Sequence, residues 1–260
     1  MYTTVNHLLK FSVDATDGDI GYVKDILFDD AQFTVRYLSV DTKRWMPLSK
    51  KVLITPVGIK VFDITDKVLH VAMKKDDVLN GPEIEDHLPI SREFEQVFFD
   101  YFGYGYYWNG MGLWGDFYDP TALNPMDTKA NREKENEDMD DLEQIQDKEE
   151  SGKPNLRSID EIQHYDIVEK DGMKGHVHDF VLNTDTWKIE FLVIDTRNWL
   201  PGGRKVLLPS EFIQSFSWKD QAVFCDIEVQ DIEQIPEYDE SQINSKEYIS
   251  QVKIACDNTR

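Results

Sequence analysis

Short hydrophobic runs alternate with polar turns along the first third of the chain. Runs rich in Val, Ile, Leu, Tyr and Phe cover 21–28, 34–41, 51–56, 59–63 and 68–73. Turn-prone stretches such as Asp29-Asp30 and Val57-Gly58 separate them. This pattern predicts β-strands with little helix between them. Five short strands at close spacing favour a small barrel or sandwich, and closure into a barrel removes exposed strand edges.

The same pattern returns once, at a constant offset of 154 residues. Between Asp17 and Glu93, 21 of 77 positions are identical to their partner at that offset, without a gap. The second set of predicted strands covers 175–182, 188–195, 205–209, 212–218 and 222–227. A period this long indicates two globular domains of one fold and not a solenoid.

A helical pattern follows each set of strands. Residues 91–99 and 245–253 each begin with a Ser at a cap position and continue with apolar residues at helical spacing. The predicted repeating unit is therefore a small β-barrel with a tail helix, and the fold class is mainly β with minor α.

Two segments occur in only one copy. The first, from Phe98 to Tyr118, has 11 aromatic residues in 21 and is called the aromatic segment below. The second, 126–154, is polar, with 11 acidic against four basic residues in 127–150, and is predicted to be a solvated linker. The predicted division is barrel 1 (1–90), tail helix and aromatic segment (91–124), acidic linker (125–157), barrel 2 (158–238) and C-terminal tail helix (239–260).

Charge and composition narrow the classes of partner. The net charge is -22, with 28 basic against 50 acidic residues, which argues against direct binding of nucleic acid or of an anionic membrane. No apolar run approaches the roughly 20 residues that span a bilayer. No secretory signal is recognisable, and Cys225 and Cys256 lie in no Cys-x-x-Cys pair. We expect a cytoplasmic protein with two free thiols.

The repeated motifs resemble the PRC-barrel family, named for the cytoplasmic domain of the photosynthetic reaction-centre H subunit. A related domain ends a ribosome-maturation factor. The resemblance covers 8–83 and 162–237 and is most specific in the second copy, at Gly175-x-Val-x-Asp179, Asp195, and the run from Trp199-Leu-Pro201 to Pro209. The first copy keeps Trp45 and Pro47 but has Leu48-Ser49 in place of the Gly-Gly turn. The segment after the first barrel also resembles that of bacterial family members with two barrels. The resemblance implies a non-catalytic assembly or interaction module.

The positions shared by both copies have a structural and a functional interpretation. The recurring aspartates either form a carboxylate binding site or accept hydrogen bonds from backbone groups at strand ends. Because they occur in both copies, the structural role is favoured. The tryptophans either bind a ligand or plug one end of a barrel, and the plug is favoured. The proposed structural motif consists of Gly21, Asp25, Asp41, Trp45, Pro47, Gly175, Asp179, Asp195, Trp199 and Pro201.

His176 and His178 are the candidate metal ligands. They alternate on a predicted strand, so both imidazoles face one side, with His164, Asp166 and Glu190 as further candidates. The spacing lacks the additional ligands of a strong metal motif, and the first copy has Tyr22 and Lys24 at these positions, so a metal site is not the favoured interpretation. No catalytic motif is present, so we expect no enzyme, no catalytic residue and no cofactor.

The aromatic segment is the candidate protein-binding region, because Tyr and Trp are enriched at interface hot spots. Its candidate anchors are Tyr104, Tyr106, Tyr107, Trp108 and Trp114. Packing between the two barrels or between subunits is favoured over a cap on its own barrel. The expected function is a scaffold that binds proteins and self-associates. The alternatives are a small-ligand or metal sensor and, by family analogy, a ribosome-assembly factor.

Overall fold

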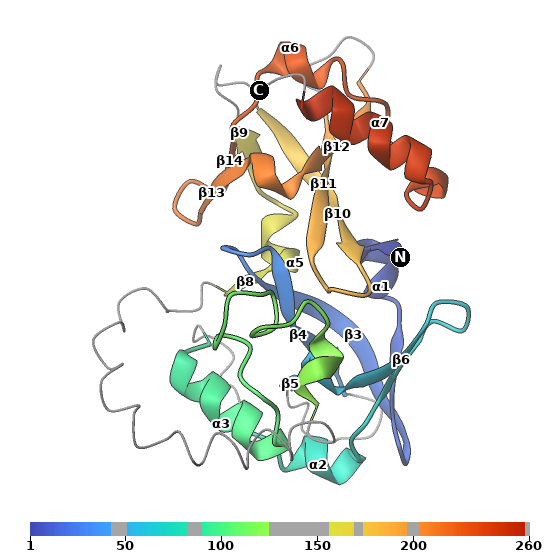
Figure 1. The fold of residues 1–260 in the computed structure, drawn as a ribbon, viewed down its shortest axis with the longest axis vertical. Coiled ribbons are helices and arrows are strands. Elements are labelled where there is room, and N and C mark those ends of the chain that lie inside the picture. Colours follow the sequence, from blue (N-terminus) through green and yellow to red (C-terminus); the bar gives the residue numbers. More distant parts are fainter. Residues whose placement is uncertain (43–50, 83–89, 125–155, 169–173, 197–202, 258–260) are drawn as a thin grey trace. The chain divides into compact units, whose positions relative to one another are not determined.

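The computed structural model of the chain describes residues 1–42, 51–82, 90–124, 156–168, 174–196 and 203–257 (Figure 1). Within these ranges the fold is mainly β and contains two mixed sheets of seven strands, which confirms the predicted fold class.

The predicted strands and tail helices are present, and short elements at the start of each repeat add to them. The first repeat has strands β1 (Tyr2–Thr4), β2 (Ser12–Ala15), β3 (Gly18–Asp29), β4 (Thr34–Asp41), β5 (Lys51–Ile54), β6 (Ile59–Asp63) and β7 (Val68–Val71). The second has β8 (Leu156–Ser158), β9 (Asp166–Val168), β10 (Lys174–Asn183), β11 (Ile189–Asp195), β12 (Lys205–Pro209), β13 (Ile213–Ser217) and β14 (Ala222–Cys225). The helices are α1 (Val5–Leu8), α2 (Lys75–Leu79), α3 (Arg92–Phe102), α5 (Ile159–Ile162), α6 (Val229–Ile232) and α7 (Lys246–Asp257). The 3₁₀ turns are η1 (Pro56–Gly58), η2 (Pro120–Leu123), η5 (Ser210–Phe212) and η6 (Glu240–Gln242).

Both sheets have the same strand order, and the order explains why they curl. The first is β5-β4-β3-β2-β7-β6 and the second β12-β11-β10-β9-β14-β13. The strands at the two ends of each order are consecutive in the chain. Thr55 and η1 join β5 to β6, and η5 alone joins β12 to β13. Such short connections hold the two ends of each sheet close together, so each sheet bends into a small barrel.

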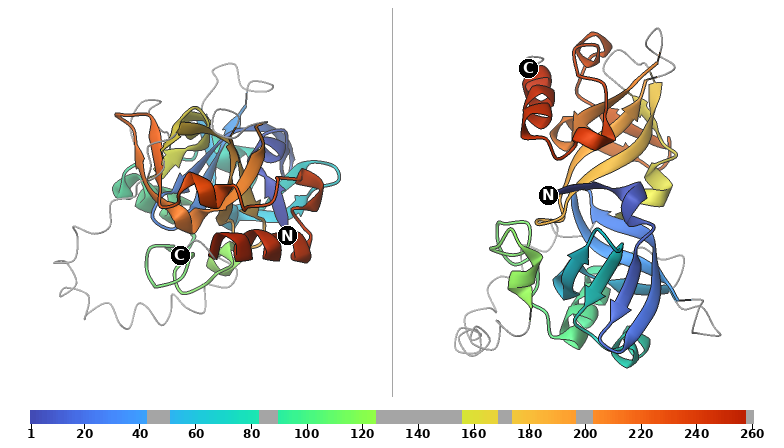
Figure 2. Two further views of the ribbon diagram at one scale, coloured as in Figure 1. Left: turned by 90° about the horizontal axis from the view of Figure 1, so that it is seen from above. Right: turned by 90° about the vertical axis from the view of Figure 1, so that its right-hand side faces the viewer.

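The first strand of each repeat pairs with the sheet of the other repeat. β1 pairs antiparallel with β10, with Thr3 opposite Leu182, and β8 pairs with β3. The right-hand view of Figure 2 shows the N-terminal strand, in dark blue, beside the strands of the second repeat. The sequence pattern did not predict this exchange.

Spatial contacts divide the chain into two interleaved compact units. Unit 1 comprises Met1–Lys10, Asp25–Val35 and Arg157–Arg260, and unit 2 comprises Phe11–Lys24 and Arg36–Leu156. The boundaries that we predicted run sequentially along the chain, whereas these units alternate because strands are exchanged.

Helix α3 positions the aromatic segment. Ser91 is its N-cap, as predicted, and its side chain accepts a hydrogen bond from the Phe94 amide at 3.2 Å. The helix ends at Gly103, whose φ of 70° gives the left-handed cap that a glycine adopts without a steric penalty. The chain then turns back, so the rest of the aromatic segment packs against α3.

Candidate functional site

Asp25 and Asp179 hold the exchanged segments in unit 1. Oδ1 of Asp179 accepts a hydrogen bond from the Asn6 amide in α1 at 3.1 Å. At the matching position, Asp25 accepts from the Asp160 amide in α5 at 3.2 Å and from the Ser158 hydroxyl at 2.8 Å. Each carboxylate therefore accepts hydrogen bonds from the N-terminal turn of a helix at the start of the other repeat, where amide groups lack partners within the helix.

Burial raises the pKa of both carboxyl groups. Asp179 is 5% exposed, and its pKa rises to about 6 because desolvation outweighs the lowering effect of the Phe180 and Asn6 hydrogen bonds. Desolvation raises the pKa of Asp25 as well, against the hydrogen bonds from Ser158 and Asp160. We predicted that these aspartates accept backbone hydrogen bonds from local groups. Each does accept one from the next amide, Ile26 for Asp25 and Phe180 for Asp179, both at 2.7 Å. Each also accepts one from the start of the other repeat, which we did not predict.

Asp41 and Asp195 end equivalent strands and are both buried. The Tyr22 hydroxyl donates to Asp41 Oδ2 at 3.1 Å. Gly21 allows the neighbouring strand to approach, because a Cβ at that residue would lie 2.0 Å from the carbonyl oxygen of Asp41. Gly175 lies in β10 opposite Ile167. The remaining positions of the proposed structural motif lie outside the described residues: Trp45, Pro47, Trp199 and Pro201.

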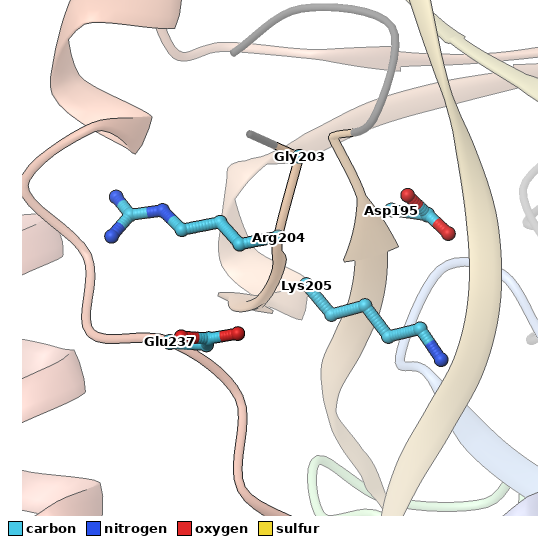
Figure 3. A pocket seen from close by; sticks show the side chains of 5 residues that line it. All are labelled: Asp195, Gly203, Arg204, Lys205 and Glu237. Carbon is cyan, nitrogen blue, oxygen red and sulfur yellow. The ribbon is translucent and has the colours of Figure 1, made fainter. Parts of the chain in front are cut away.

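Asp195 also lines a cavity of about 260 Å³ in unit 1. The other lining residues are Gly203, Arg204, Lys205 and Glu237 (Figure 3). The side chains of Arg204 and Lys205 extend in opposite directions, so their two positive charges do not converge on one point (Figure 3). Arg204 Nη2 donates to the carbonyl oxygen of Ile232 at 3.2 Å, which fixes it as a structural contact to the end of α6.

His176 and His178 are both exposed on β10, but a register shift between Val177 and Asp179 falls at His178, and the two histidines have separate partners. His176 Nδ1 lies 3.0 Å from Asp166 Oδ1, and His178 Nε2 lies 2.7 Å from Lys205 Nζ. In the described part of the chain, no three His, Cys, Asp or Glu side chains gather in a way that suits a metal ion. The metal hypothesis thus gains no support from this geometry. Neither Cys225 nor Cys256 forms a disulfide, as expected.

Unit 2 contains a buried arginine that the sequence analysis did not single out. Arg36, in β4, is 1% exposed, and its guanidinium carbon lies 3.8 Å from the centre of the Tyr107 ring and 4.9 Å from that of Trp114. Its Nη1 donates to the carbonyl oxygen of Leu113. The arginine therefore fastens the aromatic segment to the barrel through cation–π contacts and a backbone hydrogen bond.

A buried glutamate completes this network. Glu95, in α3, is fully buried and accepts hydrogen bonds from Arg92 at 2.7 Å, from the Tyr107 hydroxyl at 2.8 Å and from the Tyr37 hydroxyl at 3.0 Å. Desolvation raises the pKa of Glu95, against the lowering effect of Arg92. The signal in the sequence was Arg36 between Val35 and Tyr37, because a charged residue within an apolar strand needs a buried partner.

Part of the aromatic segment packs on its own barrel in unit 2, while our preference for packing between barrels or subunits stays a prediction. Tyr104 and Tyr107 are each 4% exposed and Trp114 is fully buried, so these three candidate anchors belong to the core of unit 2. Tyr106 and Trp108 are half-buried and stack on each other, with ring centres 4.7 Å apart.

Three exposed apolar side chains lie in the last part of this segment, 111–118, and the sequence analysis did not select them. Met111 is 97% exposed, Tyr118 70% and Phe117 43%. They lie on a tight turn, in which the Trp114 amide donates to the Phe117 carbonyl at 2.9 Å and the Phe117 amide returns a bond at 3.1 Å. We call Met111, Phe117 and Tyr118 the exposed apolar turn.

A comparison with known protein families assigns the first repeat to a domain family. Residues 13–78 match the family model of the PRC-barrel domain, a range that runs from β2 to α2. The predicted resemblance is thereby confirmed for the first repeat, while that of the second stays a prediction. No curated protein matches the chain. None of the helices within the described ranges is both long and apolar enough to cross a bilayer.

Proposed function

We propose that the chain is a non-catalytic assembly module that binds a protein partner through the exposed apolar turn. The observation that carries this proposal is that buried residues of the aromatic segment hold the exposed apolar turn in place while its own side chains remain exposed. Trp114 is fully buried beneath the turn, while Met111 is 97% exposed at its surface.

The buried network supports a preorganised binding surface. Arg36 and Glu95 tie Tyr107 and Trp114 to the barrel, so the turn is held without a partner. A surface that is ordered before binding loses little conformational entropy when a partner binds. Exposed Met and aromatic side chains are the residue types that interface cores favour.

The charges around the turn indicate the chemistry of the partner. Asp116 and Asp119 are exposed and flank Phe117 and Tyr118 in the sequence. The whole chain has a net charge of -22. An apolar centre between carboxylates fits a partner with a hydrophobic pocket and a rim of Lys or Arg, because complementary charges speed encounter and fix orientation.

Affinity capture from the native host with a tagged full-length chain tests this proposal. The variant carries Met111→Ser and Tyr118→Ser, and the matched control carries Val61→Ser, which alters an apolar residue of the same unit that is 51% exposed. We expect a partner that wild type and control capture equally and that the double variant captures about tenfold less, since loss of central interface side chains costs 1–2 kcal/mol or more.

Two results would argue against the proposal. One is a partner recovered equally with all three chains, which would place binding elsewhere. The other is a wild-type chain that captures no partner and sediments as a strict monomer over the micromolar range. Self-association that the double variant abolishes and the control retains would identify a second copy as the partner.

A further inference from the structure

The two repeats contact each other through equivalent residues in unit 1. The Val35 amide donates to the Trp187 carbonyl at 2.8 Å, and the Ile189 amide donates to the Phe33 carbonyl at 2.7 Å. At the offset of 154 residues, Val35 corresponds to Ile189 and Phe33 corresponds to Trp187, so the two bonds join equivalent pairs of residues. Between these two bonds Thr34 bridges to Lys188, which is its own counterpart.

The exchanged segments follow the same reciprocity. Asn6 in α1 donates to Asp179, and its counterpart Asp160 in α5 donates to Asp25. Both helices are capped alike, since the Thr4 side chain accepts from the His7 amide and its counterpart Ser158 accepts from the Glu161 amide. β1 and β8, the strands before these helices, pair with β10 and β3.

Such reciprocity characterises an interface with two-fold symmetry, in which residue i contacts j and j contacts i. In a symmetric dimer a residue next to the axis meets its own equivalent, as Thr34 meets Lys188 here. The pattern is therefore that of a homodimer interface built into one polypeptide.

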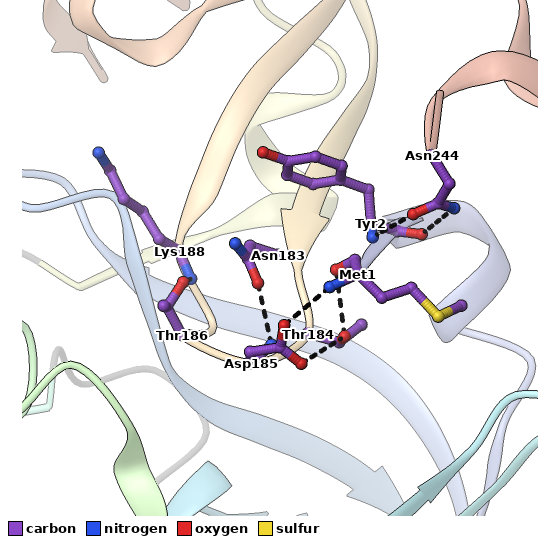
Figure 4. Close-up of polar contacts among 8 residues, drawn as sticks. All are labelled: Met1, Tyr2, Asn183, Thr184, Asp185, Thr186, Lys188 and Asn244. Atoms are coloured by element: carbon purple, nitrogen blue, oxygen red, sulfur yellow. Dashed lines mark hydrogen bonds and ion pairs between the residues drawn. The ribbon is translucent and has the colours of Figure 1, made fainter. Parts of the chain in front are cut away.

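Further contacts strengthen the N-terminal half of the exchange. The Met1 ammonium pairs with Asp185 at 2.8 Å, and the Thr184 amide donates to the Met1 carbonyl at 2.8 Å (Figure 4). Tyr2 and Asn244 exchange two hydrogen bonds, Tyr2 N to Oδ1 at 2.7 Å and Nδ2 to the Tyr2 carbonyl at 2.9 Å (Figure 4).

Aromatic side chains form the apolar part of the interface. The fully buried Phe28 of the first repeat lies 6.1 Å from Phe180 and 5.8 Å from Phe216 of the second, between ring centres. Phe33 lies 5.8 Å from Phe216. Burial of these rings adds hydrophobic stabilisation to the paired strands and the capped helices.

We propose that the chain is a covalently fused dimer whose two halves are specific non-covalent partners. The edge of β10 and Asp179 bind β1 and α1, at the start of the first repeat. β3 and Asp25 bind β8 and α5, at the start of the second. The acidic linker then connects the halves without being needed to hold them together. This goes beyond the proposed function, since it concerns neither the exposed apolar turn nor an external partner.

Cleavage of the folded full-length chain tests the proposal. A site for a specific protease is inserted after Asp140, in the predicted linker, and the purified chain is cut after folding. We expect the two fragments to co-elute as one 1:1 complex with the mass of the uncut chain, 30.3 kDa, at low micromolar concentration, and to separate only in denaturant. Fragments that elute separately without denaturant would overturn the proposal.

A matched set of variants assigns the association to the exchanged segments. The chain with Asp25→Ala and Asp179→Ala removes both acceptors, and we expect its cut fragments to dissociate at least about tenfold faster, because the Asn6 and Asp160 amides and the Ser158 hydroxyl lose their acceptors in the other repeat. The control Asp220→Ala removes a carboxylate that accepts from the Ser217 hydroxyl within the second repeat, and it should leave the dissociation rate unchanged. An equal rate in all three chains would show that the exchange does not hold the halves together.

A second variant keeps the test decisive if the double variant does not fold. Asp185→Ser removes the partner of the Met1 ammonium in an exposed ion pair, together with a 3.5 Å hydrogen bond from the Thr184 hydroxyl within the second repeat. We expect a roughly twofold to threefold faster dissociation, the scale of a surface ion pair. If Asp185→Ser leaves the dissociation rate of the cut fragments unchanged, and high salt does not change that rate either, the result would count against pairing of β1 with β10.

Discussion

Asp179 shows at the scale of a single residue how burial and hydrogen bonding compete. Its carboxylate caps α1, yet desolvation raises its pKa to about 6. An unfolded Asp titrates near about 3.9. Between about pH 4 and pH 6 the folded state therefore binds more protons than the unfolded state, and the free energy of unfolding falls as the pH rises through this window.

We predict that Asp179→Asn removes much of this pH dependence. The amide oxygen can still accept from Asn6, but no charge is buried above pH 6. Urea unfolding at pH 4 and pH 7 should show a wild-type loss from this residue on the order of 2 kcal/mol that the variant lacks. Glu247→Gln, which changes an exposed acid in α7, should retain the wild-type pH profile. A variant with the same pH profile as wild type would contradict the raised pKa.

Glu95 is the residue on which the cap of the first barrel depends. Its carboxylate accepts from Arg92, Tyr37 and Tyr107 inside unit 2. We predict that Glu95→Ala lowers the free energy of unfolding by about 3 kcal/mol, because it removes the acceptor of the partly buried Arg92 and of two buried tyrosine hydroxyls. Denaturation followed by tryptophan fluorescence measures this loss. The neighbouring exposed change Gln96→Ala should cost under about 0.5 kcal/mol, and equal losses in both variants would refute the role of the network.

At the scale of elements, the long strands followed from local pattern and the short ones did not. The predicted runs 34–41, 59–63 and 205–209 coincide with β4, β6 and β12. β1 and β8 have three residues each, too few for a periodic pattern to show. Their partners lie in the other repeat, so only long-range pairing makes them strands.

The crossing of β3 and β4 depends on Gly21. Its φ of 152° and a Cβ position 2.0 Å from the Asp41 carbonyl leave no room for a side chain. We predict that Gly21→Ala destabilises the chain by more than about 3 kcal/mol or prevents folding, since the clash is with backbone that cannot rotate away. Thermal unfolding with circular dichroism measures the change.

Gly81→Ala is the matched control for this prediction. A Cβ there meets carbonyl oxygens of Asp77 and Val78 only at 3.4 Å, an ordinary contact. This variant should remain within about 1 kcal/mol of wild type. A Gly21→Ala chain with wild-type stability would show that β3 and β4 do not approach so closely.

At the scale of the whole molecule, charge is the dominant property. A net charge of -22 makes the folded chain repel itself, because folding brings carboxylates closer together. We predict that the melting temperature rises by a few degrees between 20 and 200 mM NaCl, as salt screens surface charges. Calorimetry at the two salt concentrations measures it. A melting temperature that falls with salt would instead indicate that attractive ion pairs dominate.

The candidate site was only partly accessible to sequence reasoning. The aromatic segment was correctly singled out as unusual, but Tyr104, Tyr107 and Trp114 point into the core while Met111 is exposed. A run of aromatic residues with interspersed glycines has no regular period, so it does not indicate which rings are buried. The buried rings are the ones that contact the two buried charges, because Arg36 packs on Tyr107 and Trp114 and Glu95 accepts a hydrogen bond from Tyr107.

The sequence by itself determined that two copies of one strand-rich unit exist, where the long strands and both tail helices lie, and which acidic residues recur. Local periodicity and an offset of 154 residues are properties of the chain alone. Only the tertiary structure decided which strand completes which barrel, because two similar repeats offer β1 and β8 chemically similar edges. It also decided which distant amides donate hydrogen bonds to Asp25 and Asp179, because a hydrogen bond between residues more than 130 positions apart leaves no local pattern in the sequence.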